Sequence, residues 1–264
     1  MWVPKTLCRL ILMRRLITIE LGKLKLPVGI TISVLALGAI ILSCTLYTGY
    51  SLTYDLEAWE VGTAIISFLF PLFVVVPVCW TMYYERKDRF LIYTVPRVGK
   101  LRYLAAKWIA AAIAAFAIMF IPYLLSALAA LYLKPPITPW PRDFSHAYLE
   151  LYVSTPLLYA VLLSAWRGVL GVLVMSLGYV LSLYVGNVFV ILTGPFIYTI
   201  LENFIFAILL LPQFRLVTSF EPDSVSSELF TPWAPLVGPA VLILVTSALW
   251  LVFAKVRRLA IYEV

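Results

Sequence analysis

The sequence predicts an all-α polytopic membrane protein, and three observations lead to that fold class. Hydrophobic residues make up 63% of the 264 positions, and charged residues only 12%. The mean hydropathy of +1.01 is far above that of an ordinary soluble domain. The apolar residues come in runs of about twenty, and at about 1.5 Å per helical residue each run can cross about 30 Å of hydrocarbon. Because only short stretches separate the runs, the composition excludes a soluble domain with its own core.

Six apolar runs are expected to be transmembrane helices. The acidic residues after the first run, Asp55, Glu57 and Glu60, have no basic neighbour, which places that loop outside the cell. Arg167 and Gly168 interrupt a long apolar stretch, so we expect them to form a cytoplasmic turn between two spans. The expected spans are residues 26–47, 61–84, 108–133, 147–166, 169–192 and 236–254.

Two further segments are expected to lie at the membrane without crossing it. Residues 1–25 mix Lys and Arg with Leu and Ile, which predicts an N-terminal interfacial helix; a basic tail that only orients the first span is the alternative. Residues 195–212 are apolar but carry Glu202 and Asn203 at their middle. A sixth crossing there would place the basic C-terminal end outside, so we expect a re-entrant helical hairpin in the outer leaflet.

The charges are distributed unevenly between the two sides of this topology. Seventeen of the twenty Lys and Arg residues fall on the expected inner side, and nine of the thirteen acidic residues on the outer side. This bias predicts a multi-pass protein with both termini in the cytoplasm, in the plasma membrane of a prokaryotic cell. The net charge of +7 therefore indicates contact with a lipid bilayer and not with nucleic acid.

The most basic stretch, residues 85–107, lies between the second and third expected spans. It holds seven Lys and Arg residues against two acidic ones. Phe90, Leu91 and Val95 fall on one face of a short amphipathic helix, and Pro96 ends it. This pattern favours a surface helix that presents its polar edge to a soluble partner. The alternative is an ordinary positive-inside loop.

The same stretch resembles the permeases of the type 2 ABC exporter family. The resemblance rests on Glu85-Arg86, on Val95-Pro96-Arg97 and on Lys107. The family usually has a glycine four residues after the glutamate, where this chain has Arg89. The resemblance implies a coupling helix that docks on a separate ABC ATPase subunit, and a homodimer or a heterodimer with a homologous permease. The residues it implies in this contact are Glu85, Arg86, Arg89, Phe90, Leu91, Val95, Pro96 and Arg97.

The sequence contains no recognisable catalytic or nucleotide-binding motif. Without G-x-x-x-x-G-K-[ST] the chain is not expected to bind nucleotide, so ATP and magnesium are assigned to the partner ATPase and no cofactor to this chain. The three cysteines are too scattered for a metal site, and the single histidine, His146, is expected at the surface, away from any carboxylate cluster. Glu202 and Asn203 are candidates for a transport pathway or gate, or else face water on the outer side.

Three classes of function remain open at this stage. The first is an exporter permease for an amphipathic or hydrophobic substrate such as a peptide, a drug or a lipid-like molecule. The second is a membrane-embedded enzyme acting on lipid or peptide, for which no catalytic set is visible. The third is an ion-coupled secondary carrier, which would require intramembrane charge and an internal repeat.

Overall fold

The computed structural model describes residues 5–90, 93, 98–140, 146, 148–225, 231 and 233–256, and all regular structure in these ranges is helical. The long helices are α1 (Lys5–Thr45), α2 (Glu57–Lys87), α4 (Lys100–Tyr132), α6 (Pro156–Tyr184), α7 (Val188–Ile208) and α9 (Ala234–Val256). The short ones are α5 (Leu149–Ser154) and α8 (Leu216–Phe220), with 3-10 turns η1 (Leu46–Gly49), η2 (Pro212–Phe214) and η3 (Pro222–Ser224).

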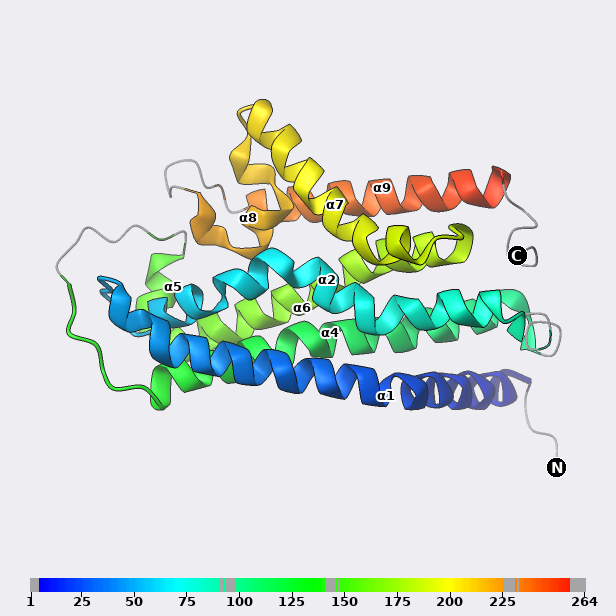
Figure 1. Ribbon diagram of the computed structural model, residues 1–264, viewed down its shortest axis with the longest axis horizontal. Helices are drawn as coiled ribbons and strands as arrows, with labels where there is room; N and C mark the ends of the chain where they lie inside the picture. Colours follow the sequence, from blue (N-terminus) through cyan, green and yellow to red (C-terminus); the bar gives the residue numbers. More distant parts are fainter. Residues whose placement is uncertain are drawn as a thin grey trace.

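Six of the described helices are long and apolar enough to cross a membrane. They run side by side along the long axis of the molecule, with α7 crossing obliquely, and the start of α1 and the end of α9 lie at the same end (Figure 1). The composition therefore correctly indicated an all-helical fold, and six helices able to span a membrane are consistent with a multi-pass membrane protein. The division of the chain among these spans differs from the expected one.

The N-terminal region is part of the first long helix. Residues expected to form a separate interfacial helix continue into the first span, and α1 extends unbroken from Lys5 to Thr45. Its 41 residues measure about 60 Å, twice the hydrocarbon thickness, so a large part of α1 extends beyond the apolar layer. Pro27 lies inside the helix, and Thr31 Oγ1 donates to the Pro27 carbonyl at 2.9 Å.

The expected turn at Arg167 and Gly168 is wrong. One helix, α6, runs through both residues from Pro156 to Tyr184. A single glycine costs a helix only about 1 kcal/mol relative to alanine, whereas a turn inside an apolar layer would leave several backbone groups without water to bind. Gly168 also allows close packing, since a Cβ there would lie 2.7 Å from the ring of Phe116 on α4. One candidate span, Pro156–Tyr184, thus replaces the two spans expected at residues 147–166 and 169–192.

The expected re-entrant hairpin at residues 195–212 is not confirmed. Most of it belongs to α7, a 21-residue helix that is itself a candidate span. Because α6 replaces two expected spans and α7 adds one, the number of candidate spans stays at six. The start of α1 and the end of α9 therefore still lie at the same end of the bundle (Figure 1). The short elements η2 and α8 then fold back beside α7 (Figure 1).

The most deeply buried helices are α2, α4 and α6, and α1 packs against α4 and α2. Small residues on α4 such as Ala110, Ala111, Ala114 and Ala115 are buried, and their four-residue spacing allows neighbouring helices to approach closely. About half of the apolar stretch of α2, α4 and α6 is buried inside the chain. The corresponding fractions for α7 and α9 are 22% and 17%, so these two helices expose most of their apolar surface.

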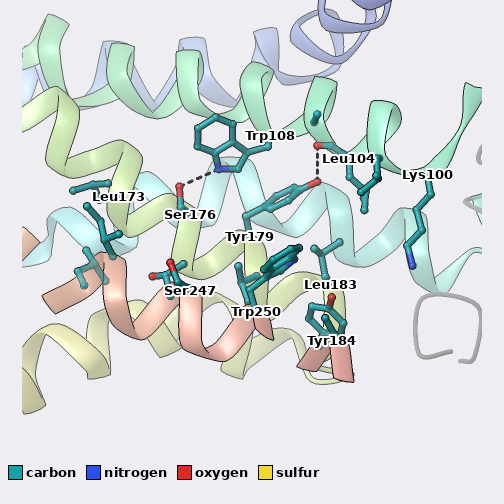
Figure 2. Close-up of a pocket in the computed structure, with 17 residues that line it drawn as sticks. Lys100, Leu104, Trp108, Leu173, Ser176, Tyr179, Leu183, Tyr184, Ser247 and Trp250 are labelled. Atoms are coloured by element: carbon teal, nitrogen blue, oxygen red, sulfur yellow. Dashed lines mark hydrogen bonds between the residues drawn. The ribbon is translucent and has the colours of Figure 1, made fainter. Parts of the chain in front are cut away.

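One consequence of this loose attachment is a cavity between α4, α6 and α9. Its volume is about 610 Å³. Trp108 from α4, Tyr179 from α6 and Trp250 from α9 lie around it (Figure 2).

Candidate functional site

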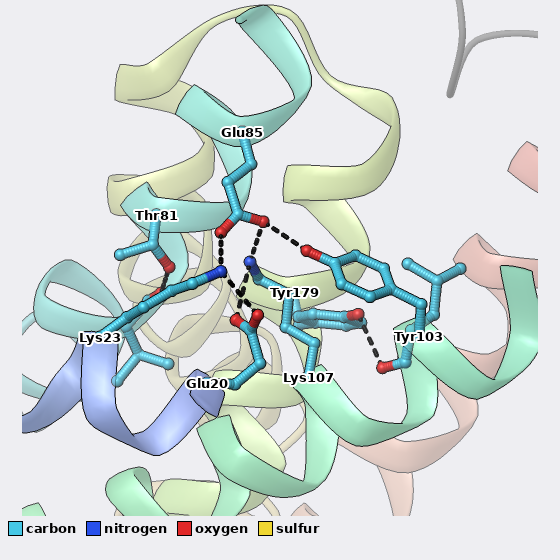
Figure 3. Close-up of polar contacts among 9 residues, drawn as sticks. Glu20, Lys23, Thr81, Glu85, Tyr103, Lys107 and Tyr179 are labelled. Carbon is cyan, nitrogen blue, oxygen red and sulfur yellow. Dashed lines mark hydrogen bonds and ion pairs between the residues drawn. The ribbon is translucent and has the colours of Figure 1, made fainter. Parts of the chain in front are cut away.

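The end of the bundle that holds the start of α1 contains an ion-pair network of Glu20, Lys23, Glu85 and Lys107 (Figure 3). Lys23 Nζ lies 2.7 Å from Glu20 Oε1 and 2.9 Å from Glu85 Oε1. Lys107 Nζ lies 3.3 Å from Glu20 Oε2 and also pairs with Glu85. The Tyr103 hydroxyl donates to Glu85 Oε2 at 2.8 Å. The network joins three helices, because its members come from α1, α2 and α4.

The ion-pair network is largely shielded from solvent. The side chains of Glu20 and Lys107 are 7% and 6% exposed, and that of Glu85 is 16% exposed. Two carboxylates face two ammonium groups, so the buried charges balance. Removing one member would leave an uncompensated buried charge, which costs much more than the intact network gains.

Arg86, the next residue of the predicted coupling motif, connects α2 to a fourth helix. Its side chain is buried and donates to the carbonyl of Val185, the residue that caps the C-terminus of α6. A cation at this position interacts favourably with the negative end of the helix dipole. The dipeptide Glu85-Arg86 therefore attaches the end of α2 to α1, α4 and α6.

The chain leaves α2 through Asp88 and Arg89. The Asp88 N–H donates to the Tyr84 carbonyl at 2.8 Å, and Arg89 has a φ of 56°, in the left-handed region that favours glycine. Arg89 is thus a left-handed helix-ending residue at the position where the resembled family has glycine. Phe90 follows and is exposed. Four other residues expected at the ATPase contact lie outside the described residues: Leu91, Val95, Pro96 and Arg97.

Glu202 and Asn203 both hold the segment that folds back after α7. The two carboxylate oxygens of Glu202 accept from the Leu216 N–H at 3.0 and 3.1 Å, which caps the start of α8. Asn203 Oδ1 accepts from Arg215 Nη1 at 3.2 Å. Glu202 is 4% exposed, so it does not face open water on the outer side. Their expected role in a pathway or gate stays a prediction.

Arg167, which the sequence placed in a turn, is a buried cation in the middle of α6. It is 1% exposed, and its guanidinium lies over the rings of Trp59, Tyr123 and Phe220 at 4.8, 4.5 and 5.1 Å. Its Nε donates to the Phe220 carbonyl at 3.1 Å, while Nη1 has no hydrogen-bond partner among the described residues. The signal that could have found this site is the lack of any proline or turn-forming pair beside Arg167.

A second charged cluster lies at the end opposite to the ion-pair network and consists of Glu60, His146 and Asp223. Ligand atoms of the three side chains all lie within 4.8 Å of one another. His146 Nε2 lies 2.8 Å from Asp223 Oδ2 and 3.7 Å from Glu60 Oε1. The expectation that His146 is a surface residue without carboxylate neighbours is therefore wrong, since it is 6% exposed. Sequence separation hid the cluster, because its members come from three segments far apart in the chain.

His146 is held in this cluster by hydrogen bonds. Burial alone would lower the pKa of His146, but its hydrogen bonds and proximity to Asp223 and Glu60 raise that pKa to about 9. In the neutral imidazole, Nδ1 accepts from the Tyr148 N–H at 3.0 Å, which places the proton of that form on Nε2.

Comparison of this chain with protein-family models, with characterised proteins and with solved structures finds no match.

Proposed function

We propose that the chain is the transmembrane permease subunit of an ABC exporter. It would move an amphipathic or hydrophobic substrate across the cell membrane, driven by ATP hydrolysis on a separate ATPase subunit. It would work as a pair of permeases, either two copies or one copy with a homologue. The observation that carries the proposal is the ion-pair network, because Glu85 and Lys107 of the resembled motif meet in it.

A coupling segment has to pass a movement on to several helices at once. The segment that follows α2 starts beside Glu85 and Arg86, and these two side chains contact α1, α4 and α6. A force applied to this segment by a docked ATPase would reach four helices through buried, charge-balanced contacts. An ordinary loop between two spans has no need of such contacts, and this difference supports the coupling role.

The proposed orientation places the ion-pair network on the cytoplasmic side, together with both termini. Single cysteines can test it on a background without the three native ones. We expect an impermeant maleimide to label Ser51→Cys in intact cells and Lys87→Cys only after permeabilisation; both positions are exposed. The reverse pattern would overturn the orientation and with it the coupling role of residues 85–107.

The exporter proposal is tested by reconstitution with a candidate ATPase subunit. We expect the purified chain alone to bind no ATP, and the pair to co-purify and hydrolyse ATP in proteoliposomes in a vanadate-sensitive manner. Nucleotide binding by the single chain, or a pair that never assembles from any co-expressed ATPase of the same genome, would contradict the proposal.

An ion-coupled secondary carrier is the second candidate, and one observation favours it. Arg167 is a buried intramembrane cation, the kind of residue that often marks an ion or substrate pathway. Its contacts to three rings and one backbone carbonyl also give it a purely structural role. Transport that stops with a protonophore but continues with vanadate would favour the carrier over the exporter.

A further inference from the structure

The cavity between α4, α6 and α9 lies in the half of the bundle that holds the ion-pair network. Its walls include Leu101, Leu104 and Trp108 of α4, Val180 and Leu183 of α6, and Trp250 of α9. Because α9 is only loosely attached, the cavity is bounded on one side by a single helix whose other face is exposed apolar surface.

Two of the aromatic residues in the walls, Trp108 and Tyr179, already use their polar atoms inside the chain. Trp108 Nε1 donates to Ser176 Oγ at 3.0 Å, and the Tyr179 hydroxyl donates to the Leu104 carbonyl at 3.0 Å (Figure 2). The rings therefore offer the cavity mainly their apolar faces. Such a surface binds hydrocarbon and gives little to a polar molecule.

The charged residues that the structure describes at the edge of the cavity are basic. Lys100 lines it at the start of α4, on the side of Leu183 and Tyr184 (Figure 2). Lys255, which is exposed, follows the lining residue Ala254 at the end of α9. None of the lining residues in the described part of the chain is acidic. An anionic group is therefore favoured at this edge, where basic residues between helices commonly bind anionic lipid head groups.

The volume of the cavity, about 610 Å³, suits a flexible hydrocarbon chain. An acyl chain is thin and can fill an irregular space between helices.

From these observations we propose that the cavity binds an acyl chain of an anionic membrane lipid, whose head group lies at Lys100 and Lys255. The lipid would enter from the leaflet at the end that carries the start of α1 and the end of α9. This inference does not rest on the exporter assignment, since lipid binding and ATP-driven transport are measured separately.

Photo-crosslinking of the full chain in lipid nanodiscs tests the site. The probe is phosphatidylglycerol with a diazirine in one acyl chain, and the comparison lipid is phosphatidylcholine with the same chain. We expect phosphatidylglycerol to label peptides of α4 and α9 around the cavity at least fivefold more strongly than phosphatidylcholine. Lys100→Gln is expected to reduce this preference to less than twofold.

Two cavity-filling variants and one matched control locate the labelling. Ala105→Trp fills the cavity from α4 and Ser247→Trp from α9; both native residues line it. Each variant should lower labelling at least fivefold, whereas Ile113→Trp on the exposed surface of α4 should leave it unchanged. Thermal unfolding identifies any variant that fails to fold, in which case the variant on the other wall decides. Unchanged labelling in a folded cavity-filling variant overturns the site, and equal labelling by the two lipids overturns the anionic head group.

Discussion

The ion-pair network and the Arg167 site bury charge in different ways. The ion-pair network compensates each buried charge with an opposite charge on another helix. Arg167 lies among the faces of three aromatic rings and donates to one backbone carbonyl. A guanidinium is weakly hydrated and stacks well on aromatic rings, which an ammonium group does less well. We infer that the stability contributed by the ion-pair network depends on each of its four charged side chains. The stability of the Arg167 site depends mainly on packing.

The largest effect is expected from Lys107→Met. This change leaves Glu20 and Glu85 buried with only the half-exposed Lys23 to balance them. Breaking a buried pair in this way typically costs about 3–5 kcal/mol of folding free energy. Thermal or denaturant unfolding in detergent measures it. The double variant Lys107→Met with Glu85→Gln should recover a large part of the loss; equal instability of both variants would show that charge balance is not the cause.

A pH-dependent effect is expected at the opposite end, through His146. The folded pKa of about 9 exceeds the ordinary value of 6.5, so protonation stabilises the fold. This contribution is complete below pH 6.5 and is lost as the pH rises to 9. We expect a loss of about 1–3 kcal/mol over this range, since each pKa unit corresponds to about 1.4 kcal/mol and protonation gives up the Tyr148 hydrogen bond.

The matched variant for this prediction is His146→Gln. It keeps a side chain that can hydrogen-bond to Asp223 but cannot titrate near neutral pH. Its unfolding curve should depend little on pH between 6.5 and 9. A wild-type protein that is equally stable at both pH values would contradict the assigned charge state of His146.

An intermediate effect is expected from Glu202→Ala. The change removes both acceptors of the Leu216 N–H and leaves a buried backbone donor unpaired, at a typical cost of about 1–3 kcal/mol. Asn203→Ala is the control with a smaller expected loss, because Arg215 keeps its bond to the Pro212 carbonyl at 2.8 Å. If Glu202→Ala folds with full stability but loses transport, the gate hypothesis gains the support that the structure alone does not supply.

The smallest effect is expected from Arg167→Met. The change loses the ring contacts and one hydrogen bond, but it also removes a desolvated cation with an unpartnered Nη1. Replacing buried charge with an apolar side chain of similar volume is often nearly neutral, so we expect a change of about 1 kcal/mol or less. A loss as large as that of Lys107→Met would contradict the distinction between the ion-pair network and the Arg167 site. Loss of transport at unchanged stability would instead support a pathway role for Arg167.

Much of the fold could be read from composition and run length. Six apolar runs and short connections were sufficient to predict a helical, multi-pass protein. The expected helix boundaries differ from the observed ones at two charged residues. The sequence pattern places Arg167 in a turn and makes Glu202 evidence against a membrane crossing. In both cases the side chain finds its partners inside the protein, so the helix has no reason to end there. Hydropathy counts a charge as exposed and does not record the contacts that compensate it.

The sequence by itself determined that long stretches of the chain favour a hydrocarbon environment, and roughly how long the helices in it are. The transfer of apolar side chains into hydrocarbon depends on local composition alone. Only the tertiary structure decided which charges meet. Lys23 and Glu85 are separated by 62 positions and yet lie 2.9 Å apart, because the last turn of α2 lies beside the first half of α1. The same holds for Glu60, His146 and Asp223 at the other end. Such contacts depend on distances between helices, which the order of residues along the chain does not state.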